Sequence, residues 1–152
     1  MDYKVCCFVG HNDTEFTEEL KERVKTKIEE LIEKENYGVF KFGGMGGFDY
    51  GCWEIVNELK QKYPFIKTVL CIWEGKLPWW AKKRKYDDVE ILPLNFDYWY
   101  SHLYYRNTAM IDTCDYCLFY VCNTENSGAY KAMKYAAIHK KAYTNFGVIE
   151  KK

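Results

Sequence analysis

Short apolar runs alternate with longer amphipathic segments along the chain, and this alternation restricts the fold more than any other feature. Six runs have the length and near-continuous hydrophobicity of buried strands: 4–10, 39–42, 66–73, 89–94, 116–121 and 142–146. Four segments between them carry apolar residues at helical spacing: 16–32, 52–63, 97–112 and 129–137. Asp13 and Thr14 precede the first segment and are its predicted helix caps. The order predicts an α/β protein with helices on both faces of a mainly parallel sheet of five to six strands.

Composition favours one globular domain over residues 1–152. The chain is 48% hydrophobic and 29% charged, with 22 basic and 22 acidic residues, so its formal net charge is zero. A balanced chain has no long-range field that attracts nucleic acid, and this argues against such a partner. No apolar run reaches the roughly 20 residues that span a bilayer, and the first residues resemble a strand, not a signal peptide.

The seven cysteines indicate a reducing compartment, because they are odd in number and almost all sit in apolar segments. We therefore expect a cytoplasmic protein. Cys114 and Cys117 have CxxC spacing, but one such pair without a second pair or two nearby histidines is weak evidence for zinc. We interpret them as core cysteines and predict no metal and no cofactor.

Five of the ten glycines fall in "FGGMGGFDYG", between the second predicted strand and the second predicted helix. Glycines such as Gly43, Gly44, Gly46 and Gly47 permit positive φ and close approach of a ligand, and the helix start behind them favours an anion. Asp49 could cap the helix, hold a ribose hydroxyl or, in an enzyme, act as a catalytic group. The alternative is a tight turn that needs glycine only for packing. Neither G-x-G-x-x-G nor a P-loop is present.

Two other predicted strands end in polar turns at the same edge of the sheet. Gly10, His11 and Asn12 follow the first strand, and Ser127 with Gly128 precedes the last helix. Carboxyl ends of parallel strands converge, so we predict that these residues form one anion or ribose site with the glycine segment. His11 could instead only cap a turn, and polar turns before helices are also ordinary caps.

Arg106 and Asn107 lie on a predicted helix that is otherwise largely apolar. An inward-facing arginine needs a partner, which could be Asp112, Asp115 or a ligand phosphate held by two hydrogen bonds. We predict that Arg106 and Asn107 belong to the ligand site.

Segment 76–85, "KLPWWAKKRK", combines tryptophans with basic residues. It is a candidate lid in which Trp79 or Trp80 stacks on a base while Lys82 or Arg84 meets phosphate. A nucleic-acid patch, an oligomer contact and a solvated loop over the sheet edge are the alternatives. The high aromatic content, with 14 Tyr, 9 Phe and 5 Trp, also suits a homo-oligomer surface.

Four stretches together resemble the SLOG superfamily, and within it the small YpsA-like proteins of Firmicutes and their phages. They are "CCFVGHN", "GGMGGFDYGCWEIVNELKQKYPFIK", "YRNTAMIDTCDYCLFYV" and "SGAYKAMKYAAIHKKAY", and they span nearly the whole chain in order. The resemblance implies a Rossmann-like three-layer sandwich whose pocket binds nucleotides or nucleotide-derived ligands. Relatives include phosphoribohydrolases, the DNA-processing protein of natural transformation and sensors of ADP-ribose-type signals.

The chain departs from the family pattern at two places. Asn12 stands where relatives have arginine, and the turn at Ser127 lacks the threonine and glutamate of phosphoribohydrolases. We therefore expect a protein that senses or sequesters a nucleotide-derived small molecule, such as an ADP-ribose-type signal. The alternatives are an enzyme acting at an N-glycosidic bond and a nucleic-acid or protein interaction module that uses segment 76–85.

Overall fold

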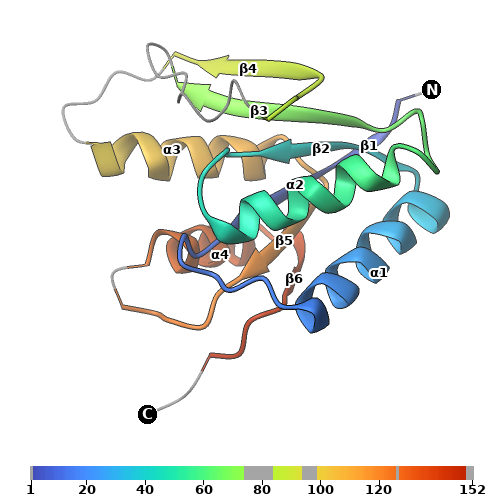
Figure 1. Ribbon diagram of the computed structural model, residues 1–152. Coiled ribbons are helices and arrows are strands. Elements are labelled where there is room, and N and C mark those ends of the chain that lie inside the picture. The colour runs from blue at the N-terminus through green and yellow to red at the C-terminus, as the bar shows by residue number, and fades with distance from the viewer. Residues whose placement is uncertain (1, 74–83, 94–98, 126, 150–152) are drawn as a thin grey trace.

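The computed structural model describes residues 2–73, 84–93, 99–125 and 127–149. They form one six-stranded sheet with the strand order β4-β3-β2-β1-β5-β6, in which every neighbouring pair is parallel (Figure 1). The elements are β1 (Lys4–Gly10), α1 (Glu18–Glu35), β2 (Tyr37–Phe42), α2 (Gly47–Leu59), β3 (Lys67–Trp73), β4 (Asp88–Leu92), α3 (Trp99–Asp112), β5 (Tyr116–Tyr120), α4 (Gly128–Ile138) and β6 (Ala142–Asn145). The predicted α/β class is confirmed.

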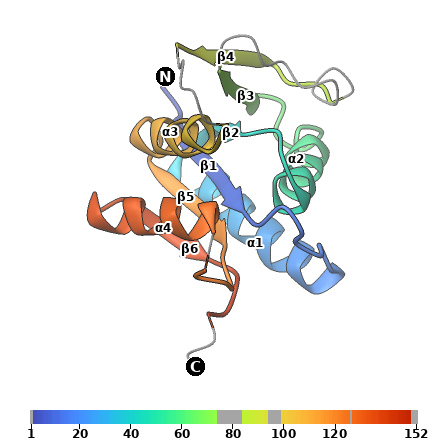
Figure 2. The same cartoon turned by 90° about the vertical axis from the view of Figure 1, so that its left-hand side faces the viewer.

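The helices cover the sheet from both sides. Figure 2 shows α1 and α2 on one side of the strands and α3 and α4 on the other, so the molecule has three layers. This arrangement is the Rossmann-like sandwich that the family resemblance implies. In the described part of the chain, no helix combines the length and the apolar character needed to cross a membrane.

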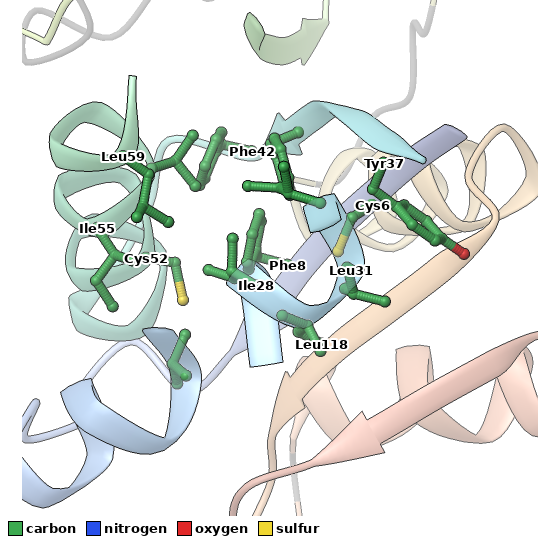
Figure 3. Packing of buried hydrophobic residues seen from close by; sticks show 14 of the residues in the cluster. Cys6, Phe8, Ile28, Leu31, Tyr37, Phe42, Cys52, Ile55, Leu59 and Leu118 are labelled. Carbon is green, nitrogen blue, oxygen red and sulfur yellow. The ribbon is translucent and has the colours of Figure 1, made fainter. Parts of the chain in front are cut away.

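Two apolar cores follow from the alternation of side chains along the central strands. Cys6 and Phe8 of β1 face α1 and α2, where Phe8 stacks on Phe42 with ring centroids 4.7 Å apart (Figure 3). Cys7 and Val9 of the same strand belong to the second core, with α3 and α4. Because successive strand residues point to opposite faces, one short apolar strand supports both layers.

Helix α1 begins at Glu18, later than the predicted start after Asp13 and Thr14. The side chain of Thr17 accepts a hydrogen bond from the Leu20 amide and caps the helix. Thr14 instead donates its hydroxyl to the carbonyl of His11, over 2.7 Å. The predicted cap is therefore wrong, and Thr14 stabilises the turn after β1.

The order in which successive strands are added to the sheet reverses between β1 and β5. From β1 the chain runs outward through β2, β3 and β4, and after α3 it continues at β5 on the opposite side of β1. In open parallel sheets, the loops that leave the strands at such a switch point diverge and leave a crevice at their carboxyl ends. Most of the predicted ligand-binding residues lie at this place.

Candidate ligand-binding site

A cavity of about 810 Å³ opens at the carboxyl ends of β1, β2 and β5, beside α3 and the start of α4. Its lining includes residues 10–12 at the end of β1, together with Gly43 after β2 and Asp49 in the first turn of α2. Arg106 and Asn107 of α3 contribute as well. Parts of the sequence that lie far apart thus meet at one cavity.

The turn before α4 completes this lining. Ser127 and Gly128 both reach the cavity, and a Cβ at position 128 would have no heavy atom within 4 Å. Ser127 is 7% exposed, and its hydroxyl caps α4 by accepting from the Tyr130 amide at 3.0 Å. The turn therefore serves both the helix and the cavity wall.

Three glycines of the glycine segment, Gly44, Gly46 and Gly47, lie outside the cavity lining. Gly44 and Gly46 have φ of 78° and 93°, which favour glycine. A Cβ at Gly46 would lie 2.7 Å from the α-carbon of Asn12, and one at Gly47 would lie 2.3 Å from the carbonyl oxygen of Thr14. Close packing on the loop after β1 accounts for Gly46 and Gly47, and a Cβ at Gly44 would lie 2.7 Å from Leu70. Ligand contacts at these three positions stay a prediction.

Asp49 holds the glycine segment in place. Its two carboxylate oxygens accept the amides of Gly43 at 2.9 Å and Gly44 at 3.1 Å, so the side chain caps the turn and not its own helix. The residue is 4% exposed, and burial raises the pKa of Asp49 to about 6. Arg106, Arg84 and the two amides act in the opposite direction, and burial outweighs them.

Arg106 is bound by neutral oxygens and not by the carboxylates that the sequence suggested. Its Nε and Nη2 donate to Oδ1 of Asn107 at 3.2 and 3.1 Å, and Nη1 donates to the Gly43 carbonyl at 2.9 Å. Asp112 accepts from the Tyr135 hydroxyl, and Asp115 from the Val5 amide. These two carboxylates are engaged elsewhere, which corrects that part of the prediction.

The Arg106 side chain is consequently a buried cation next to an open cavity. The residue is 6% exposed, and its guanidinium also lies over the Trp73 ring at 5.9 Å. Burial lowers the pKa of Arg106, but arginine remains charged at neutral pH. The nearby Asp49 carboxylate opposes this effect of burial but accepts no hydrogen bond from Arg106, so an anionic group in the cavity would add the direct pairing that a buried charge favours.

His11 connects the loop after β1 to the loop after β5 through hydrogen bonds. Its Nε2 accepts the amides of Cys122 at 3.0 Å and Asn123 at 3.3 Å, so the ring proton belongs on Nδ1, which lies 3.4 Å from the Ser127 hydroxyl. Burial lowers the pKa of His11. The neutral ring shapes the cavity wall, whichever ligand it meets.

Sequence analysis missed further residues that line the cavity. Ser101 and Tyr104 come from the turns of α3 that precede Asn107, and Lys131 lies one turn after Gly128 on α4. Helical spacing of three or four residues from the predicted positions would have pointed to Tyr104 and Lys131. Asp13 and Glu125, both exposed, add carboxylates to the same lining.

Most of the candidate lid lies outside the described residues, including Trp79, Trp80 and Lys82. Arg84 is described, and its Nη1 lies 3.5 Å from Oδ2 of Asp49. Its guanidinium also lies over the Tyr50 ring at 4.6 Å. Arg84 does not line the cavity, so it acts on the site through Asp49.

The fold and the cavity at its switch point define a Rossmann-like α/β protein, and comparisons with known proteins agree at the level of fold. DNA processing protein A (DprA) from Streptococcus pneumoniae superposes with a TM-score of 0.67 at 16% identity, over 94% of this chain and 50% of that one. The molybdenum cofactor carrier protein MCP from Chlamydomonas reinhardtii gives a TM-score of 0.56 at 11% identity, over 95% and 76%. The fold is therefore DprA-like, as the SLOG resemblance implies.

A curated relative comes from a Bacillus prophage. The uncharacterised SPbeta prophage-derived protein YoqJ of Bacillus subtilis (strain 168) is 37% identical over 73 residues, an alignment that covers 42% of each protein. The chain thus matches less than half of that relative's length and spans half of DprA. No family model matches the chain. The closer YpsA-like placement stays a prediction.

Proposed function

We propose that the protein binds a nucleotide-derived small molecule in the cavity and acts as a sensor or a sequestering protein. The observation that carries the proposal is the Arg106 guanidinium, which lines the cavity while its hydrogen bonds to the described residues go to neutral oxygens of Asn107 and Gly43. A phosphate has the charge and the geometry that such a guanidinium binds best.

Other features of the cavity suit a ligand of this class. Its volume of about 810 Å³ matches the range typical of cofactor and nucleotide pockets. Lys131 and the start of α4 at Gly128 add positive potential on the side of β5. Tyr104 offers an aromatic ring for a base, and Asp13 and Glu125 offer acceptors for hydroxyl groups.

Binding without turnover is favoured over catalysis by the state of Asp49. A nucleophile or general base at an N-glycosidic bond needs a carboxylate oxygen that is free to reach the substrate. Both oxygens of Asp49 already accept backbone amides, and the residue is almost fully buried. We therefore assign Asp49 to ordering the site, with the ribose contact as a secondary role.

The proteins of similar fold are compatible with this function, but they do not identify the ligand. MCP is described as a carrier of the molybdenum cofactor, so a protein of similar fold holds a small molecule. DprA is described as a DNA processing protein. DNA is the less favoured ligand for this chain, because its formal net charge is zero.

The test is a thermal-shift and calorimetric titration with AMP, ADP, ATP, NAD, ADP-ribose, cyclic ADP-ribose and cyclic dinucleotides. A ligand at 100 times its dissociation constant stabilises the fold by about 2.7 kcal/mol, which is easily detected. Arg106→Gln should weaken binding by roughly tenfold or more, because a charge-assisted hydrogen bond contributes about 1.5–3 kcal/mol. The control is Lys134→Gln on α4, outside the cavity lining.

Chromatography of the bound ligand distinguishes a binding protein from an enzyme. Recovery of the intact ligand supports a binder, whereas recovery of cleaved products would make the protein an enzyme. No stabilisation by any member of the panel, or equal affinity in Arg106→Gln and wild type, would contradict the proposal.

A further inference from the structure

Three thiols that are far apart in the sequence meet in the core between the sheet and helices α3 and α4. The Sγ of Cys114 lies 3.3 Å from that of Cys7 and 3.4 Å from that of Cys117. All three sulfur atoms lie within 4.8 Å of one another. Sequence analysis assigned Cys114 and Cys117 to the core because a single CxxC pair without a second pair or two nearby histidines is weak evidence for zinc. Cys7 lies 107 positions from Cys114, so sequence spacing did not connect it to this pair.

Topology brings the three together. Cys7 of β1 and Cys117 of β5 are register partners in neighbouring parallel strands, and both belong to the core that α3 and α4 cover. Cys114 lies in the turn between α3 and β5, where its amide donates to the Ile111 carbonyl and directs the chain back over the sheet. Cys6 belongs to the opposite core (Figure 3) and takes no part.

We propose that Cys7, Cys114 and Cys117 form a three-thiolate site for Cu(I). Thiolate sulfur is a soft ligand and favours soft ions such as Cu(I). Structural zinc sites almost always have four ligands, whereas among the described residues the group contains these three and no fourth His, Asp, Glu or Cys. The thiols are 0%, 2% and 0% exposed, so solvent does not supply a fourth ligand from an open position.

The geometry requires little rearrangement. With metal–sulfur bonds of about 2.3 Å, as in zinc thiolates, three sulfurs at the corners of a planar triangle are separated by about 4.0 Å. The separations from Cys114 to Cys7 and to Cys117, 3.3 and 3.4 Å, are shorter than this value, and the separation between Cys7 and Cys117 is at most 4.8 Å. Small side-chain rotations within the core are sufficient to admit the ion.

The surroundings of the three cysteines supply a compensating positive charge and a short path for the ion from solvent. Each thiol that binds exchanges its S–H bond for a Cu–S bond and releases one proton to solvent, without oxidation or reduction. Lys141 donates its ammonium group to the carbonyl of Cys114 at 3.0 Å and places a positive charge beside the anionic cluster. Thr113 and Asp115, the neighbours of Cys114, are exposed, so only one turn separates the cluster from solvent.

This site is separate from the ligand cavity, whose lining includes none of the three cysteines. The cluster lies at the opposite end of β5, near its first residues, whereas the cavity lies beyond the last ones. The inference therefore does not depend on the proposed nucleotide-binding function.

The experiment is an anaerobic titration in which the protein competes with bicinchoninate for Cu(I) kept reduced by ascorbate. Wild-type protein should remove one Cu(I) per chain from the coloured chelate. Cys114→Ser and Cys7→Ser should lose this capacity, whereas Cys71→Ala and Cys122→Ala should retain it. Cys71 is a matched control because it is buried in the same core, and Cys122 controls for an exposed thiol.

X-ray absorption of the wild-type copper complex provides a measurement that needs no variant. Three sulfur neighbours around copper support the site, while two sulfurs or any nitrogen or oxygen neighbour would overturn it. Failure of the wild-type protein to compete for Cu(I), retention by Cys114→Ser, or preferential binding of Zn(II) over Cu(I) would overturn it as well.

Discussion

The guanidinium of Arg106 lies directly over the α-carbon of Gly43. A Cβ on residue 43 would be 2.7 Å from Cζ, 2.8 Å from Nη2 and 2.9 Å from Nη1 of Arg106. The same guanidinium donates to the Gly43 carbonyl at 2.9 Å. A side chain at residue 43 would prevent the Arg106 guanidinium from approaching the backbone, which accounts for the glycine. The turn after β2 and Arg106 therefore depend on each other for their positions in the site.

Gly43→Ala should displace Arg106 and lower the free energy of unfolding. Insertion of an extra methyl group into a well-packed interior typically costs about 1–3 kcal/mol. Urea unfolding of the variant should show this loss, and titration should show weaker ligand binding because the guanidinium has moved. Gly128→Ala is the control, since a Cβ there meets no atom within 4 Å. Equal stability of Gly43→Ala and wild type would refute the contact.

Asp49 should make stability depend on pH between about 4 and 6. Its folded pKa of about 6 exceeds the ordinary 3.8, so the unfolded chain loses its proton first as the pH rises. The folded state therefore loses stability between pH 3.8 and 6, and the loss is constant above pH 6. Two pH units correspond to about 2–3 kcal/mol.

Asp49→Asn isolates this effect, because the variant has no carboxyl group at the position. Other groups titrate equally in both proteins and cancel in the difference. The free energy of unfolding of wild type, measured in urea at pH 4, 5, 6 and 7, should fall relative to that of the variant up to pH 6. Parallel curves for the two proteins would show that burial does not raise the pKa of Asp49.

His11 should act in the opposite pH direction. Its neutral Nε2 accepts two amides, and burial lowers its folded pKa below the ordinary 6.5. The contribution is complete above pH 6.5 and is lost as the pH falls towards the folded pKa, because the unfolded chain binds the proton first. His11→Phe removes the acceptor, so we expect about 1 kcal/mol lower stability at pH 8 and a smaller difference at pH 5.5. A pH-independent difference in urea unfolding would contradict this role.

The sequence predicted the elements and the edge where the site lies, because both depend on local patterns. Short apolar runs identified the strands and a period of 3.6 residues identified the helices. The alternation of the two implied that turns such as that at Gly10 and that at Ser127 meet at one edge. The predicted helix start failed at Thr14 because Thr14 and Thr17 are equally good caps. Only the contact of Thr14 with His11 decides between them.

The pairings within the site could not be predicted, since they depend on contacts between distant segments. Arg106 and Gly43 are 63 positions apart, so nothing near either residue indicates that one explains the other. A glycine-rich turn that packs on a cation has the same sequence as one that receives a ligand. For the same reason, the sequence did not show that Cys7 lies beside Cys114 and Cys117. Its neighbour in sequence, Cys6, belongs to the other core.

Gly128→Leu should block the cavity without disturbing the fold. Position 128 is exposed, starts α4 without a positive φ and has open space where a Cβ would be placed, so the new side chain extends into the cavity region that Gly128 lines. We expect wild-type stability in urea and at least tenfold weaker binding of the ligand identified from the nucleotide panel. Ala137→Leu, on an exposed position of the same helix outside the lining, is the matched control. Unchanged affinity in Gly128→Leu would place the ligand elsewhere, whereas a loss of stability would mean that the turn before α4 has no room for a side chain.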